Sequence, residues 1–304
     1  MLRYALKRFG MVLGTAIVIS SVTFLLIHAL AGNPFSCQRN PAACLHEAKV
    51  YGLDQSLVVQ YRTFVWNLLH LNLGYSYVNQ GVEVTPLLAR EAGNSLTLGV
   101  FALAVTIVVG LAVGITAAIR QNSWLDYTLS SFVVFGYSLP SFVLATLLII
   151  AMGILLPNWT GLIGWGSPSQ IPLPAIALGL PYAAVVARLT RASVLDVVRQ
   201  DYVRTAWAKG LSSRVIVIRH ILRNALIPVV TIGGPLVTGL ITGSVVIEAI
   251  FGIPGLGKEF VDSILTRDYN IVVGLYTLYA LLVGLANLAV DLIYPLLDPT
   301  IRYT

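Results

Sequence analysis

Residues 190–228 read TRASVLDVVRQDYVRTAWAKGLSSRVIVIRHILRNALIP and lie between two strongly apolar parts of the chain. Eight basic residues occur between Arg188 and Arg223. Burying them in a bilayer would cost on the order of 20 kcal/mol, at about 2.5 kcal/mol for each charge. This basic segment must therefore lie outside the hydrocarbon, as a connection between membrane spans.

The basic segment has the pattern of a helix and not of a flexible linker. Several of its side chains recur at three- and four-residue spacing and predict one helical face: Val194, Val197, Val198, Tyr202, Thr205 and Ala206. Gly210 follows this run as a C-cap glycine would, and Ser212 or Ser213 can cap the next helix. Two interpretations are open: an amphipathic helix on the lipid headgroups, or a rigid elbow that presses into a soluble partner.

On both sides of this segment the chain consists of apolar runs. Of its 304 residues, 57% are hydrophobic and 11% are charged, whereas soluble domains average about 25% charged residues. A run of about 20 apolar residues can cross a bilayer as a helix. Six spans are predicted: Phe9 to Ala31, Ser95 to Ile119, Tyr127 to Leu156, Ile171 to Leu189, Ala225 to Ile250, and Tyr269 to Leu297. The predicted fold class is all-α integral membrane, with six transmembrane helices.

The distribution of charge predicts how these spans are oriented. With the N-terminus in the cytoplasm, 13 of the 19 Lys and Arg residues fall on the inner side. The other six lie in outer loops, where eight acidic residues outnumber them, so both termini are expected in the cytoplasm. The first span ends in Ala29-Leu30-Ala31, which imitates a signal-peptidase site. Its apolar run is longer than a signal-peptide core, so a retained helix is expected.

The longest break between spans, Gly32 to Asn94, lies outside the cell in this topology. Amphipathic stretches such as Leu57 to Leu71 predict short helices over the outer mouth. Cys37 and Cys44 also lie in this loop, in what should be an oxidising compartment. A disulfide between them is the preferred interpretation, and two unpaired thiols are the alternative.

Prolines and glycines mark where the spans are irregular or closely packed. Five prolines in and beside the third and fourth spans predict kinks: Pro140, Pro157, Pro172, Pro174 and Pro181. Such kinks either permit gating or are irregularities without a function. Three G-x-x-x-G pairs predict close approach of helix backbones: Gly10 and Gly14, Gly110 and Gly114, and Gly239 and Gly243.

The sequence offers no residues for catalysis. It contains no H-E-x-x-H, no G-x-S-x-G and no Cys/His metal spacing, and its four histidines are scattered. It also lacks G-x-x-x-x-G-K-[ST], which excludes a P-loop ATP site. The span interiors carry almost no charge, which disfavours coupling to protons or sodium. The net charge of +6 is not gathered in a patch with interleaved aromatic residues, so we expect no nucleic-acid partner. Because the motifs above are missing, we also expect no catalytic, cofactor-binding or metal-binding residue.

Several stretches carry a family resemblance. DYVRTAWAKG, Asp201 to Gly210, and RHILRNALIP, Arg219 to Pro228, resemble the cytoplasmic coupling loop of ABC importer permeases of the dipeptide and oligopeptide (peptide/nickel) branch. EAIFGIPGLGKEFVDSILTRDYNIV, Glu248 to Val272, and DLIYPLLDPTIRY, Asp291 to Tyr303, resemble the family's segment after the fifth span and its C-terminal signature. YGLDQSLVVQY and LNLGYSY in the outer loop are also similar, so the resemblance covers nearly the whole chain.

The resemblance implies a contact site for an ATPase. The wider family has an E-A-A-x-x-x-G loop, whose opening positions would be Arg204, Thr205 and Ala206 here. Arg replaces Glu at the first position, as in the peptide branch. The implied coupling residues are Asp201, Tyr202, Arg204, Thr205, Ala206, Lys209 and Gly210. Tyr202, Thr205 and Ala206 are expected on the helix face that enters the ATPase.

The resemblance also implies an architecture and partners. It implies a type I ABC importer permease fold in the inner or plasma membrane of a prokaryotic cell. Residues 1–94 would form the first span and outer loop, and residues 95–304 the permease core, with a coupling loop at about 190–224.

The implied function is to form half of the translocation pathway for di- or oligopeptides. A second homologous permease would complete a heterodimer, two separate ATPases would bind ATP and Mg, and an extracytoplasmic binding protein would deliver substrate. The alternatives are import of nickel chelates or oligosaccharides or, in other classes, an intramembrane enzyme or a scaffold.

Overall fold

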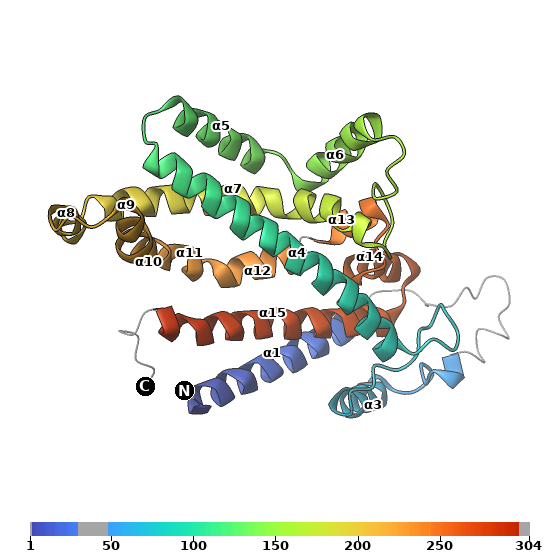
Figure 1. Cartoon of the computed structure of the whole chain (residues 1–304). Helices are drawn as coiled ribbons and strands as arrows, with labels where there is room; N and C mark the ends of the chain where they lie inside the picture. The colour runs from blue at the N-terminus through green and yellow to red at the C-terminus, as the bar shows by residue number, and fades with distance from the viewer. Residues whose placement is uncertain (1, 30–47, 243, 298–304) are drawn as a thin grey trace. The chain divides into compact units, whose positions relative to one another are not determined.

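A computed structural model describes residues 2–29, 48–242 and 244–297 (Figure 1). These residues are helical except for their connections and one isolated bridge between Tyr75 and Glu83, which confirms the all-α class. The α-helices are α1 Leu2–Ala29, α3 Leu57–Leu69, α4 Val84–Ile119, α5 Trp124–Ser138, α6 Ser141–Leu155, α7 Pro172–Val198, α8 Asp201–Ala208, α9 Ser213–Val215, α10 Arg223–Ala225, α11 Ile227–Thr231, α12 Gly233–Thr242, α13 Ser244–Phe251, α14 Leu256–Thr266 and α15 Tyr269–Leu297. A 3-10 turn, η1 Pro168–Gln170, and a π-helix, η2 Ile216–Leu222, complete the helical segments.

The described helices agree with the predicted membrane spans in number. Five segments are long and apolar enough to cross a bilayer: Tyr4–Ala29, Val84–Ile119, Pro168–Val198, Gly233–Phe251 and Tyr269–Leu292. Together, α5 and α6 also meet this criterion and would make a sixth span. The fifth predicted span is shorter than expected, because the chain from Ala225 is divided among the short helices α10 and α11 before Gly233.

The third predicted span is sharply bent. The angle between α5 and α6 is 109°, and the break lies at Leu139 and Pro140. Proline has no N–H to donate to the preceding turn and disfavours helical geometry at the residue before it. Leu139 accordingly has an extended backbone (φ −88°, ψ 125°), and the carbonyl of Pro140 accepts the first bonds of α6 from Val143 and Leu144.

The helices belong to two compact units. One comprises Met1–Ser95 and Pro254–Leu285, and the other Leu96–Ile253 and Ala286–Thr304. The long helices α4 and α15 contribute to both units. The predicted division into residues 1–94 and 95–304 concerns function and remains a prediction, as does the disulfide, because Cys37 and Cys44 lie outside the described residues.

In the first unit a buried carboxylate joins the connection between α3 and α4 to α15. Asp268 is 1% exposed and precedes the first residue of α15. Its carboxylate accepts hydrogen bonds from the Ser76 hydroxyl, from the Val78 N–H at 3.2 Å and from the Ile271 N–H at 3.4 Å. Burial and the nearby Asp268 raise the pKa of Tyr77, so this phenol stays neutral.

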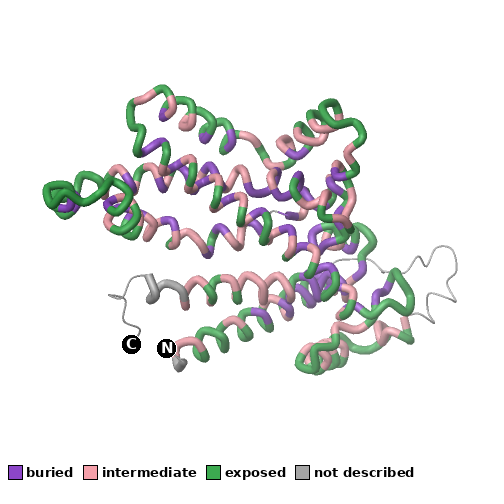
Figure 2. The backbone as a smooth tube through the Cα atoms, viewed as in Figure 1, coloured by how far each residue is buried: buried purple, intermediate pink, exposed green. Residues whose placement is uncertain are grey.

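The second unit is centred on α7. Figure 2 shows buried positions along the length of this helix, which packs against α5, α6 and α10 to α13. Its contact with α4 depends on glycine. A Cβ at Gly110 would lie 2.7 Å from the Val186 side chain, and one at Gly114 would lie 2.6 Å from the Ala187 carbonyl oxygen. This predicted G-x-x-x-G pair is therefore confirmed as a site of close helix contact.

Candidate functional site

The predicted coupling helix is separate from the membrane helix before it. α7 ends at Val198, Gln200 has an extended backbone (φ −72°, ψ 146°), and α8 begins at Asp201. The Gln200 carbonyl accepts the first bonds of α8, from the N–H groups of Val203 and Arg204. The prediction of one helical face through both helices is therefore wrong, because the extended residue resets the helical phase.

One face of α8 is anchored in the chain. Val203 is fully buried and Ala206 is 5% exposed. They pack in one cluster with residues from neighbouring helices: Ala118, Val194, Ile216, Ile221 and Ala225. The prediction that Ala206 shares an outward face with Tyr202 and Thr205 is wrong. Ala206 faces the buried cluster, whereas Tyr202 and Thr205 are exposed.

The other faces of α8 are exposed. The exposed residues are Asp201, Tyr202, Arg204, Thr205, Trp207, Ala208 and Lys209. Arg204 and Asp201 form an exposed ion pair at 3.7 Å, which contributes little stability. The Tyr202 hydroxyl accepts a hydrogen bond of 2.8 Å from the Asn224 side-chain amide. Asn224 lies in α10, so this bond joins α8 to α10.

Gly210 ends α8 as the sequence predicts. Its φ is +73°, and its N–H donates to the Trp207 carbonyl at 3.0 Å. The Leu211 N–H donates to the Ala206 carbonyl at 3.4 Å, and the two bonds together form a Schellman motif. Ser212 occupies the N-cap position of α9, but its side chain makes no capping bond.

The return to the membrane passes through the π-helix η2. Within it, Ile216 and Ile221 are both buried in the cluster under α8, although they are five residues apart. Such spacing does not share a face in an α-helix, whereas the i to i+5 bonding of a π-helix brings it round. The sequence analysis did not identify this segment as irregular.

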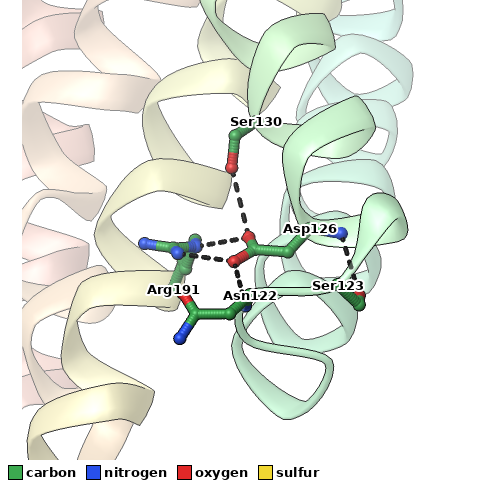
Figure 3. Close-up of polar contacts among 5 residues, drawn as sticks. All are labelled: Asn122, Ser123, Asp126, Ser130 and Arg191. Atoms are coloured by element: carbon green, nitrogen blue, oxygen red, sulfur yellow. Dashed lines mark hydrogen bonds and ion pairs between the residues drawn. The ribbon is translucent and has the colours of Figure 1, made fainter.

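A charged pair joins α5 to α7 (Figure 3). The Arg191 guanidinium donates to both Asp126 carboxylate oxygens at 2.7 Å, and the Asp126 side chain is 3% exposed. The Asn122 N–H and the Ser130 hydroxyl also donate to this carboxylate, at 3.1 and 3.3 Å. The Ser123 hydroxyl caps α5 by accepting from the Asp126 N–H. Four donors thus satisfy the buried carboxylate, and the two that come from Arg191 fix α5 against α7.

Sequence reasoning missed this pair. It counted Arg188 and Arg191 as charges of a cytoplasmic loop, whereas both lie inside α7, which continues to Val198. The Arg188 guanidinium lies over the Tyr137 ring, 5.6 Å from its centroid. A local signal for the cap existed in Ser123 and Asp126, but a partner 65 positions away leaves no local pattern.

The chemistry of the described residues is that of docking and packing. Among them, no group of three or more His, Cys, Asp or Glu side chains is placed to hold a metal ion. The arrangement instead offers a short exposed helix, α8, which packs on a buried apolar cluster and is held near both ends by hydrogen bonds. Such a helix can transmit movement between a bound partner and the membrane helices.

Comparisons with solved structures show the fold. A structure titled as inward-facing conformations of the MetNI methionine ABC transporter matches with a TM-score of 0.60 and 21% identity, over 70% of this chain and 96% of that chain. An amino acid ABC transporter with histidines matches with a TM-score of 0.52 and 18% identity, over 69% and 94% of the two chains. The predicted type I ABC importer permease fold is therefore confirmed.

Comparisons of sequence show the family. The dipeptide transport system permease protein DppB of Bacillus subtilis is 42% identical, over 99% of this chain and 98% of that protein. The oligopeptide transport system permease protein OppB of Haemophilus influenzae is 38% identical over the whole of both chains. Residues 110–303 match the family model described as binding-protein-dependent transport system inner membrane component. The chain belongs to this family of multi-pass inner membrane transport permeases.

Proposed function

We propose that this chain forms half of the translocation pathway of an ATP-driven importer for di- or oligopeptides. The observation that carries the proposal is the match to dipeptide and oligopeptide permeases over essentially the whole chain. The matched region includes the outer loop and the basic segment and is not confined to the membrane core. The alternative cargoes, nickel chelates and oligosaccharides, have no such support among these relatives.

The proposed partners are a second homologous permease, two ATPases that bind ATP and Mg, and an extracytoplasmic binding protein. The exposed faces of α8 are the proposed contact with one ATPase. Burial of Val203 and Ala206 supports this role, because a helix seated on a packed base can transmit force. Thr205, Arg204 and Trp207 are exposed and available to the ATPase. Both termini are proposed to lie in the cytoplasm.

Reconstitution tests the substrate class. The complex of both permeases and both ATPases in vesicles is supplied with its binding protein and with tripeptide, nickel chelate or oligosaccharide. We expect ATP hydrolysis and uptake to rise with the peptide alone. A response only to the chelate or the sugar would replace peptide as the cargo. If none of the three substrates changes the rate of ATP hydrolysis, the result would contradict an importer of these substrates and favour an enzyme or a scaffold.

Substitution of Gly210 tests the coupling role. Gly210→Val places a β-branched residue at a φ of +73°, which costs about 1 kcal/mol or more in backbone strain. A Cβ there would meet no atom within 4 Å, so any effect arises from the backbone and not from a clash. We expect the variant to insert and to bind its partner permease, while ATPase retention or transport falls several-fold.

Ser212→Val is the matched control for this experiment. It introduces the same side chain two residues later, where φ is −64° and ψ is 147°, which suit a β-branched residue. Ser212 makes no side-chain capping bond that would be lost. Normal transport and normal ATPase retention in Gly210→Val would contradict coupling through this turn and favour a helix resting on the lipid headgroups.

The outer loop, residues 32–94, is the proposed docking site for the binding protein. Val78 and Val82 are exposed on a turn whose backbone is fixed by the Asp268 carboxylate and by the Ser76 N–H bond to the Val82 carbonyl. Replacing both valines with glutamate is expected to weaken docking about tenfold, because apolar contacts in an interface are replaced by charges. Docking is measured by titrating labelled binding protein onto the vesicles. Unchanged affinity, with the complex intact, would remove this turn from the docking site.

A further inference from the structure

Helix α3 has one exposed apolar face that its own unit leaves uncovered. Val58 is 78% exposed, Trp66 is 64% exposed and Leu69 is 63% exposed. Arg62 lies between them at helical spacing and makes no ion pair or hydrogen bond within the described part of the chain. No residue of α3 is fully buried. A face of this kind, with aromatic, aliphatic and basic side chains, needs an occupant.

The contacts of α3 with α1 fix its position along the membrane span that α1 forms. The Tyr61 hydroxyl is 2.9 Å from the Ser21 hydroxyl, and the Phe64 ring stacks on the Phe24 ring with centroids 5.0 Å apart. Ser21 and Phe24 lie inside the span Tyr4–Ala29. Ser21 is about 12 Å before the end of this helix, at 1.5 Å per residue. Figure 1 shows α3 beside the end of α1 that is remote from the N-terminus.

A buried cluster beside α3 indicates the same depth. Phe64 packs against the cluster of Ile27, Val272 and Val273, and the two valines lie within the first turns of the span that begins at Tyr269. α3 is therefore held where one span ends and another begins. With 13 residues it is about 20 Å long, too short to cross a hydrocarbon core of about 30 Å. These contacts place it at the membrane surface.

The exposed face has the chemistry of a helix lying in that surface. Amphipathic interfacial helices bury aliphatic side chains at the acyl boundary and hold aromatic rings at headgroup level. Val58 and Leu69 supply the aliphatic part and Trp66 supplies the ring. Arg62, in the middle of the same face, can lay its stem along the apolar side chains and reach a lipid phosphate.

We propose that α3 is an interfacial anchor that lies in the outer leaflet of the bilayer, with its Val58, Arg62, Trp66 and Leu69 face in the lipid. The outer loop then has two separate surfaces, a lipid-facing α3 and a turn at residues 78–82 that remains free for a soluble partner. The anchor depends on the membrane location of the chain and not on the peptide substrate. If the anchor proposal fails, the proposal of a peptide substrate is not affected.

Photo-cross-linking in the intact complex tests the occupant of this face. Benzoylphenylalanine replaces Val58 in one variant and Thr63 in the control variant. Thr63 is also exposed but lies on another side of α3, where it lines a cavity of about 330 Å³. The complex is irradiated in vesicles of phosphatidylethanolamine and phosphatidylglycerol, with and without the binding protein.

We expect lipid adducts on the peptide that contains position 58, at least about fivefold more than at position 63, and no change when the binding protein is added. A cross-link from position 58 to the binding protein or to the second permease would overturn the proposal. Equal lipid adducts at positions 58 and 63 would also overturn it, because the lipid would then contact both sides of the helix.

Tryptophan fluorescence provides a second measurement. The emission of Trp66 is obtained as the difference between the wild-type complex and its Trp66→Phe variant. Brominated phosphatidylcholine should quench this difference about twofold, while aqueous iodide leaves it unchanged. Quenching by iodide without quenching by brominated lipid would show that Trp66 faces water and would contradict the anchor.

Discussion

Replacing Arg191 with glutamine is expected to destabilise the permease by about 3 kcal/mol, because the Asp126 carboxylate then stays buried without its cation. This is the low end of the range for broken buried ion pairs. The Asn122 N–H and the Ser130 hydroxyl still donate to the carboxylate, and the Arg191 side chain is 33% exposed. The measurement is the midpoint of thermal unfolding of the purified complex, together with the amount of folded permease in the membrane.

Two variants make this prediction specific. Arg199→Gln removes an exposed basic residue of the same segment and should change the midpoint little. Asp126→Asn combined with Arg191→Gln removes both charges, so it should recover part of the loss. If the double variant is as unstable as the sum of the single variants, the loss does not come from an unpaired buried charge.

Gly114→Ala is the second change with a large expected effect. The new Cβ would lie 2.6 Å from the Ala187 carbonyl oxygen and 2.7 Å from the Thr190 Cβ, so α4 and α7 must separate. Overpacking of this kind costs about 1 to 3 kcal/mol. We expect a lower unfolding midpoint and less assembled complex, measured by size-exclusion chromatography of a fluorescent fusion.

Gly99→Ala is the matched control in the same helix. Apart from the α4 backbone and the chain neighbours, no atom of the described residues lies within 4 Å of a Cβ at Gly99. The same substitution there should be neutral or slightly stabilising, since alanine favours a helix over glycine by about 1 kcal/mol. An equal loss in both variants would mean that α4 needs flexibility and not close contact with α7.

The spans could be predicted from the sequence because lipid requires long apolar helices, and hydropathy records that requirement directly. Their close contacts could be predicted only in part. Gly110 and Gly114 allow close approach of α7, whereas no described residue beyond the α1 backbone and the chain neighbours lies within 4 Å of a Cβ at Gly10 or Gly14. The G-x-x-x-G spacing is the same in both cases. What differs is the neighbouring helix, which one-dimensional spacing does not specify.

The basic segment, residues 190–228, shows the same limit. The turn at Gly210 was predictable, because a glycine that follows a helical run has a local conformational reason to be there. The orientation of Ala206 was not, because it depends on one extended residue, Gln200, which has no proline or glycine to mark it. The pairing of Asp126 with Arg191 joins two helices distant in the sequence, so no local pattern could reveal it.

The bonds to Asp268 have a consequence for how this protein family can vary in length. The chain is attached to the start of α15 at Ser76 and Val78, a few residues before α4 begins at Val84. Insertions or deletions upstream of Ser76 therefore need not shift the register of α4 in the membrane. Because loop-closure entropy grows only slowly with length, such changes also cost little stability. The connection that precedes Ser76 can thus vary in length while α4 and α15 keep their positions in the membrane.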